Sequence, residues 1–252
     1  SRELFWDVGR SQEILCRSSQ NLEVMSYTYL FLDLAVISIP LVFSFNRRFP
    51  FFKEWKYFLP ALVVVAIPFI VWDMLFTNLG VWGFNPDYLV GVNLFNLPIE
   101  ELLFFVCIPY ASVFTFFSLQ KLIPSLAEIK IAKSLQVSAT VLLFAIGVIT
   151  LDQWYTSITY LSLSISHGYL VFKNVQWLPT FYVSYIILLL PFFIVNGLLT
   201  GSFIEGEIVW YNDMHNFGIR LFTIPIEDVF YGMLLILLNV HLMEVFKYKR
   251  IW

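Results

Sequence analysis

The sequence predicts an all-α polytopic membrane protein with about seven transmembrane helices, arranged as two parallel three-helix repeats joined by a linking helix. Three observations predict this fold. Hydrophobic residues make up 59% of the 252-residue chain and charged residues only 13%, whereas soluble domains carry roughly a quarter charged residues. Apolar runs recur at about 17–25 residues, the length of a helix that crosses a bilayer. An eleven-residue motif occurs twice.

Seven apolar runs are the expected transmembrane helices. They cover residues 27–45, 57–76, 94–119, 135–151, 155–172, 178–199 and 221–246. The fifth run is the weakest, because hydroxyl side chains and His167 dilute it. Whether the chain crosses the membrane an odd or an even number of times depends on this helix.

The repeated motif divides the chain into two halves. Residues 91–101 (GVNLFNLPIEE) return as residues 218–228 (GIRLFTIPIED) at a constant offset of 127. Residues 68–77 match residues 191–200 at an offset of 123, so the loop that follows has four extra residues in the second half. Further upstream, Tyr27-Thr28 aligns with Tyr155-Thr156.

These matches predict the domain organisation. With a single connecting helix, both units point the same way across the membrane, as in parallel repeats related by an axis along the membrane normal. Equivalent acids would then face each other across this axis. The predicted units are an interfacial segment (1–26), repeat one (27–121), the linking helix (122–154), repeat two (155–247) and a tail (248–252).

The distribution of basic residues predicts the orientation. Eleven of the 15 Lys and Arg residues fall on the side of the C-terminus. Cytoplasmic loops carry the excess of Lys and Arg, so we expect a cytoplasmic C-terminus and acidic motifs toward the outer side. We therefore expect an integral protein of the cell membrane, with the lipid bilayer as one partner.

The main catalytic candidates are the paired acids Glu100-Glu101 and Glu227-Asp228. Each pair follows a proline, a residue favoured at the first turn of a helix, and acids there complement the helix dipole. Helix capping is therefore one interpretation. The other is functional, because ionisable groups in a membrane bundle are expensive and this chain carries them twice. Two adjacent carboxyls with little water do not both stay charged, so we expect one to donate a proton and its neighbour to accept one.

Other polar and aromatic residues accompany these acids. Asp73 and Asn196 occupy matching places in the two halves, either as hydrogen-bonding residues between helices or as supporting groups for the acids. Aromatic rings attract cations, although most aromatic residues in such a chain face lipid or core. The candidates for lining a cation site are Trp72, Trp82, Phe104, Phe105 and Tyr231.

Several function classes are excluded by what the sequence lacks. His167, His215 and His241 show no metal-binding spacing, and the two cysteines are far apart, so no metal site is expected. Gly-rich nucleotide-binding motifs are missing. No basic patch interleaved with aromatic residues suggests nucleic acid.

The doubled Pro-x-Glu-Glu/Asp motif, with a glycine seven residues before each proline, resembles the membrane-integral lycopene cyclase family. The resemblance covers roughly residues 27–247 and is supported by the proline-led runs that contain Asp73 and Asn196. Members are two small three-helix proteins or a fusion of the two, and fungal relatives join the fusion to a phytoene synthase. This chain departs from exact symmetry, because Gly232 replaces Phe105, Asn196 replaces Asp73 and the second loop is longer.

The resemblance implies the substrate and the reaction. The substrate would be lycopene or a related linear carotenoid, cyclised at its ψ-ends to β-ionone rings with no net redox change. Glu100 and Glu227 would be the principal acids, with Glu101 and Asp228 as their partners or bases. No cofactor is expected, with a flavin or lipid activator left open, and association with other carotenoid enzymes is a further expectation.

Two other classes compete with a β-cyclase. One is a proton-coupled transporter, because parallel repeats and intramembrane acids fit it equally well, but the other spans carry little charge. The other is a cyclase that makes ε-rings or acts on a longer carotenoid. A retinal-binding photoreceptor is excluded, because the run 221–246 contains no lysine for a Schiff base. Ring type, one-end or two-end cyclisation, the roles of the halves and the oligomeric state stay open.

Overall fold

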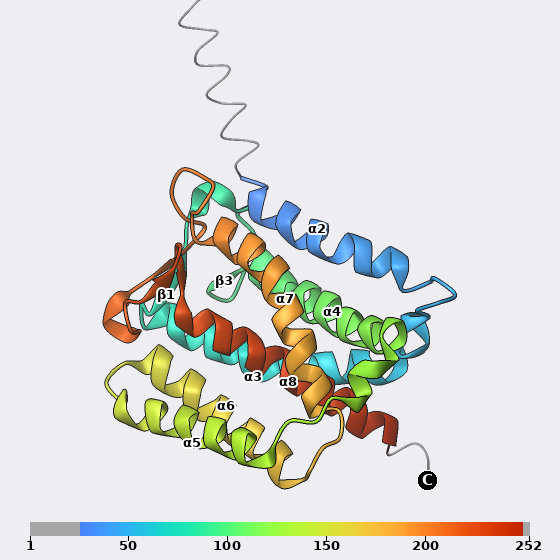
Figure 1. Cartoon of the computed structure of the whole chain (residues 1–252). Coiled ribbons are helices and arrows are strands. Elements are labelled where there is room, and N and C mark those ends of the chain that lie inside the picture. Colours follow the sequence, from blue (N-terminus) through green and yellow to red (C-terminus); the bar gives the residue numbers. More distant parts are fainter. Residues whose placement is uncertain (1–25, 249–252) are drawn as a thin grey trace, which may run out of the picture.

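The computed structural model describes residues 26–248, and this part of the chain is mostly helical (Figure 1). Its helices are α2 (Thr28–Phe43), α3 (Trp55–Asn78), α4 (Ile99–Leu122), α5 (Lys133–Ile149), α6 (Trp154–Phe172), α7 (Leu178–Leu199) and α8 (Ile226–Tyr248). Its strands are β1 (Trp82–Phe84), β2 (Asn93–Leu94), β3 (Leu97–Pro98), β4 (Val209–Tyr211), β5 (Arg220–Leu221) and β6 (Ile224–Pro225). The interfacial segment predicted for residues 1–26 lies outside the described residues except for Ser26, as does the tail beyond residue 248.

Four of these helices, α3, α4, α7 and α8, are long and apolar enough to cross a membrane. Among the others, α2 and α5 have 16 and 17 residues, and α6 is interrupted by hydroxyl side chains. Along α3, Val63, Ile67, Val71 and Leu75 form an outward stripe in which each side chain is at least half exposed. A helix that is apolar on its outer face as well as its inner face suits a lipid environment.

The helices pack in successive layers (Figure 1). Helix α2 packs along α4, α4 contacts α7, and α3 packs on α8. On the other side, α6 packs on α8 and α5 packs on α6. The two helices that begin with paired acids, α4 and α8, are thus both central, and their first turns lie next to the short strands.

Two predicted helix starts are wrong, because residues 94–98 and 221–225 belong to β-hairpins. Strand β2 pairs with β3, and β5 pairs with β6, each through a two-residue turn. Such turns favour residues with positive φ, and here Phe95 (φ 58°) and Phe222 (φ 60°) occupy that position. The prediction of a purely α-helical chain missed these strands, because each pairs over only two residues.

A third pair of strands joins the two halves of the chain. Strand β1 pairs with β4, which places Gly83 opposite Trp210. A Cβ at Gly83 would lie 2.4 Å from the Trp210 ring, so only glycine fits there. This pairing fixes the loop after α3 to the loop after α7 and brings Trp82 and Tyr211 to the same place.

Candidate active site

The first acid of each pair holds the backbone of the loop that precedes it. The Glu100 Oε1 atom accepts a hydrogen bond from the Val90 backbone N–H at 2.7 Å. In the second half, Glu227 Oε1 accepts from the Phe217 N–H at 2.8 Å and from Thr156 Oγ1 at 2.6 Å. Both glutamates are fully buried. Glycine, hairpin, proline and first acid therefore form a structural unit that sets the start of α4 and of α8.

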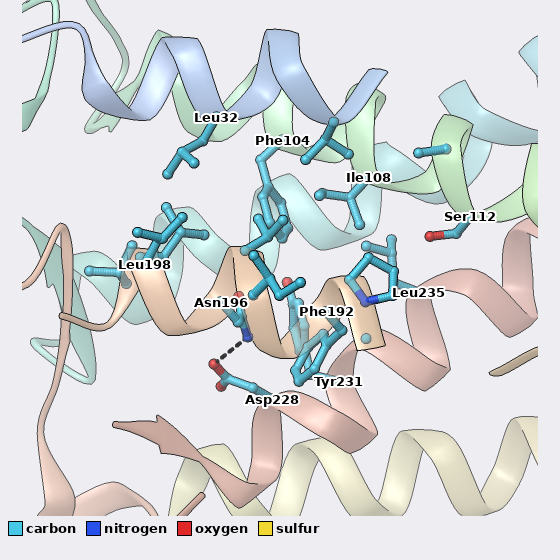
Figure 2. Close-up of a pocket in the computed structure, with 18 of the residues that line it drawn as sticks. Leu32, Phe104, Ile108, Ser112, Phe192, Asn196, Leu198, Asp228, Tyr231 and Leu235 are labelled. Atoms are coloured by element: carbon cyan, nitrogen blue, oxygen red, sulfur yellow. Dashed lines mark hydrogen bonds between the residues drawn. The ribbon is translucent and has the colours of Figure 1, made fainter. Parts of the chain in front are cut away.

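The second acid of each pair lines a cavity. Glu101 from α4 and Asp228 from α8 both border one mostly apolar cavity of about 470 Å³, and neither Glu100 nor Glu227 does. Figure 2 shows this space between α2, α4, α7 and α8, with Asp228 at its floor. In each motif the first acid thus bonds the preceding loop and the second acid borders the cavity.

The cavity extends to the surface of the helix bundle between α2 and α7. Ala35 on α2 and Ile194 on α7 both line it and both are exposed, and the Ile194 side chain is 55% exposed. In Figure 2, Leu32 on α2 and Leu198 on α7 are among the apolar side chains that line the space between these two helices. The mouth therefore opens where lipid would surround the bundle, not at an end of the molecule.

Glu101 lies among other acidic and phenolic groups. Its Oε2 atom accepts a hydrogen bond from the Tyr29 hydroxyl at 2.6 Å. Asp73 on α3 lines the same cavity. Asp73 accepts a hydrogen bond from the Trp82 indole N–H at 2.5 Å. Two carboxyls that share a site with no basic group beside them favour keeping one proton between them.

Asp228 lies among neutral hydrogen-bond donors. Its Oδ1 atom accepts from the Tyr155 hydroxyl at 2.6 Å. Its Oδ2 atom accepts from Asn196 Nδ2 at 3.0 Å, drawn as a dashed line in Figure 2, and from the Tyr211 hydroxyl at 3.0 Å. Burial and the Asp228 charge raise the pKa of Tyr211 well above its usual value, so Tyr211 stays a neutral donor. Three donors stabilise an ionised carboxylate.

The two carboxyls are therefore chemically different, although the motif places them at equivalent positions. The difference originates at Asp73 and Asn196, which occupy matching places on α3 and α7. Asp73 places a second carboxyl on the Glu101 side of the cavity, whereas Asn196 donates a hydrogen bond to Asp228. One side of the cavity can supply a proton and the other side can receive one.

The predicted aromatic residues fall into two groups. Trp82, Phe104 and Tyr231 line the cavity, whereas Trp72 and Phe105 do not. Trp72 packs against Tyr231 with ring centroids 5.1 Å apart, and Phe105 packs against Phe104 at 5.7 Å. Trp72 and Phe105 thus pack against the rings that line the cavity and do not line it themselves.

Sequence reasoning missed the tyrosines that hold the two carboxyls. Tyr29 and Tyr155 lie 72 and 73 residues before the acids that they bond. Tyr29, and not Tyr27, is therefore the counterpart of Tyr155, so the alignment of Tyr27-Thr28 with Tyr155-Thr156 is displaced by two residues. Tyr211, the last residue of β4, was missed because its counterpart at the offset of 127, Phe84, has no hydroxyl group.

The three histidines lie apart from this cavity. His167 contacts Thr140 and Tyr182 at 2.7 and 2.5 Å, and His215 stacks on Trp154. Within residues 26–248, no group of three His, Cys, Asp or Glu side chains is placed to hold a metal ion.

Comparisons with known proteins point to one family. A family model described as "Lycopene cyclase" matches the chain twice, over residues 26–119 and 152–246. The chain is also 30% identical over 100 residues to the bifunctional lycopene cyclase/phytoene synthase of Podospora anserina. That alignment covers 38% of this chain and 17% of the fungal protein. No solved structure matches the chain.

Proposed function

Because the chain belongs to the lycopene cyclase family, we propose that it cyclises the ψ-ends of lycopene to β-ionone rings by acid–base catalysis without net redox change. The observation that carries this proposal is that Glu101 and Asp228, from different halves, line one apolar cavity. A proton donor and a proton acceptor across a dry cavity are what an isomerisation through a carbocation requires.

The first step assigned to this site is protonation of the terminal double bond by Glu101. We assign one shared proton to the Asp73–Glu101 pair, and this proton is the one transferred. After the transfer Trp82 still donates to Asp73 and Tyr29 still donates to Glu101, so each carboxylate keeps a hydrogen bond. Protonation leaves a tertiary cation at the end of the chain. This assignment replaces the expectation that Glu100 and Glu227 are the principal acids, because both of those bond loop backbone away from the cavity.

The second step is ring closure inside the aromatic part of the cavity. The neighbouring double bond of the polyene attacks the cation, so one carbon–carbon bond forms and the positive charge moves into the new ring. Trp82, Phe104 and Tyr231 line the space, and their ring faces stabilise a cation that water would otherwise capture. The apolar lining keeps water away from this intermediate.

The last step is removal of a ring proton by Asp228. The electrons of the broken C–H bond form the ring double bond, so the product is an isomer of the substrate and no oxidant or reductant is consumed. Asp228 accepts three hydrogen bonds, from Tyr155, Asn196 and Tyr211, and we assign it the role of the carboxylate base. The position of Asp228 relative to the cation decides which proton is lost, and we assign the β-ring outcome to it.

The substrate would reach this site from the bilayer, one end at a time. The mouth between α2 and α7 is apolar and lies along the helices, so a long hydrocarbon can insert one ψ-end while the remainder stays in lipid. We further propose seven transmembrane helices, two parallel repeats related by a pseudo-twofold axis, and a cytoplasmic C-terminus. Contact with other carotenoid enzymes would follow from the shared, water-insoluble substrates.

The test is expression of the chain in a lycopene-accumulating bacterial host and chromatography of the extracted pigments. Monocyclic or bicyclic carotene in cells with the wild-type chain, and lycopene alone in cells with Glu101→Gln, would support the proposal. Unchanged lycopene beside a membrane-inserted wild-type chain would contradict it. Longer-chain and partly cyclised carotenoids supplied to the same host would then show whether another linear carotenoid is the substrate.

A further inference from the structure

Asp33 is a buried carboxyl with no role in the steps of the proposed reaction. It lies on α2, one helical turn after Tyr29, and only 2% of it is exposed. Its Oδ2 atom is fully buried and has no hydrogen-bond partner. An acid buried in this way requires an explanation, because an isolated carboxylate in apolar surroundings is very costly.

Asp33 lies near the two acids of the first motif. Tyr29, one turn before it on α2, donates to Glu101 Oε2 at 2.6 Å, and α2 packs along α4, whose first turn carries Glu100 and Glu101. Glu100 also has a buried oxygen, Oε2, without a partner. The two ion pairs among residues 26–248, Arg220–Asp213 and Lys247–Glu54, involve none of these acids. With no basic group to balance them, the unpartnered oxygens of Asp33 and Glu100 are satisfied when a proton is present.

The second half carries no acid at the corresponding place. Thr159 follows Tyr155 by four residues, as Asp33 follows Tyr29, and it is fully buried with an unpartnered Oγ1 atom. Three further buried carboxyls, Asp33, Asp73 and Glu100, thus accompany the proposed proton donor Glu101. Asp228 and Glu227 instead accept hydrogen bonds from hydroxyl and amide groups.

The proposed reaction explains why the first half carries more buried acids than the second. Each cyclisation leaves Glu101 without its proton and Asp228 with one extra, so Glu101 must regain a proton before the next ψ-end reacts. Glu100 lies at the border between the bundle and the loop, where it bonds the Val90 N–H and residues 91–96 are exposed to the outside. Buried acids are therefore available to carry a proton from this loop, starting at Glu100, to Glu101.

Resting on the proposed function, we propose that Asp33, together with Glu100, returns a proton to Glu101 after each cyclisation. Asp33 is then a positioning and proton-transfer residue and does not touch the substrate. Its loss would slow every turnover after the first and leave the first turnover intact, because the resting Asp73–Glu101 pair already holds a proton.

The test compares the first turnover with the steady state for the purified full chain in lipid–detergent micelles that contain lycopene. With enzyme in excess, Asp33→Asn should form product at nearly the wild-type rate. With lycopene in excess, it should be slower by about tenfold or more, since a proton-transfer group contributes roughly 10²–10⁴-fold to a rate. Asp33→Glu should restore the steady-state rate.

The matched control is Thr159→Val, which removes the counterpart polar atom in the second half. It should leave the ratio of first-turnover to steady-state rate unchanged. Asp33→Thr, which copies the second half, replaces Asp33→Asn if the latter does not accumulate. An unchanged ratio in the Asp33 variants, or an equal loss in both regimes, would overturn the role of Asp33. A wild-type chain that does not cyclise lycopene would instead overturn the proposed function, and this inference with it.

Discussion

Glu101 and Asp228 occupy equivalent positions of a repeated motif, line the same cavity and each accept a hydrogen bond from a tyrosine, yet their remaining neighbours differ. Glu101 is placed beside a second carboxyl, Asp73, whereas Asp228 accepts hydrogen bonds from Tyr155, Tyr211 and Asn196. The repeated motif thus places an acid on each side of the cavity, and the residues at positions 73 and 196 give these two acids different neighbours.

Removing either cavity acid should abolish cyclisation. We expect Glu101→Gln and Asp228→Asn to lose about 10²–10⁴-fold in activity, the contribution of a general acid or base. Glu227→Gln should retain most of the activity, because the amide oxygen still accepts the Phe217 N–H and the Thr156 hydroxyl. The measurement is carotene formed per amount of membrane-inserted protein. Loss of activity in Glu227→Gln together with an active Asp228→Asn would show that the assignment within the motif is reversed.

Exchanging the supporting residues should remove the asymmetry. Asn196→Asp places a second carboxyl beside Asp228, so the two acids would share a proton and Asp228 would be a weaker base. Asp73→Asn removes the proton-sharing partner of Glu101. Both variants should be slower than wild type in the pigment assay. Asn196→Gln keeps an amide and is the control for the second half; if Asn196→Asp were as active as wild type, Asp228 would not need to be ionised.

Much of the fold and of the site was predictable from the sequence. The apolar runs predicted all seven helices of residues 26–248, and the repeat predicted that α4 and α8 begin with paired acids. Three of the five predicted aromatic residues, Trp82, Phe104 and Tyr231, line the cavity. These features depend on local periodicity and on exact repetition, which a sequence displays directly.

The remainder depends on contacts between distant residues. Which acid of a pair faces the cavity is decided by hairpins whose strands pair over two residues, too short for a periodic signal. Tyr29 and Asp33 lie on α2 and meet Glu101 only when α2 packs along α4. Asp33 in particular is a single acid in an apolar run with no motif around it.

The pairing of β1 with β4 should be intolerant of any side chain at Gly83. Gly83→Ala would drive a methyl group into the Trp210 ring, where the Cβ would lie 2.4 Å from a ring carbon. Overpacking of this kind costs about 1–3 kcal/mol, measured as a lower thermal unfolding midpoint in detergent. Gly232→Ala is the control, because its Cβ would have ordinary contacts of 3.5 Å or more and alanine favours a helix by roughly 1 kcal/mol. Equal stability of the two variants would show that Trp210 can move aside.

Narrowing the mouth of the cavity should block a long substrate without harming the fold. Ile194 lines the cavity and is 55% exposed, so Ile194→Trp places an indole ring between α2 and α7. Leu190→Trp adds the same ring one turn earlier on α7, where the side chain is 72% exposed and does not line the cavity. Both rings are compatible with lipid, so the two variants should insert and unfold alike.

Only the first variant should lose activity, and the form of the loss identifies the route. If lycopene enters between α2 and α7, Ile194→Trp should lower kcat/KM by about tenfold or more, because a displaced substrate loses its alignment with the catalytic acid. Replacing Ala35 on the facing helix by Trp should act in the same way, and Leu34→Trp should not. If Ile194→Trp and Leu190→Trp were equally active, the substrate would have to enter from an end of the bundle, past the hairpins that precede α4 and α8.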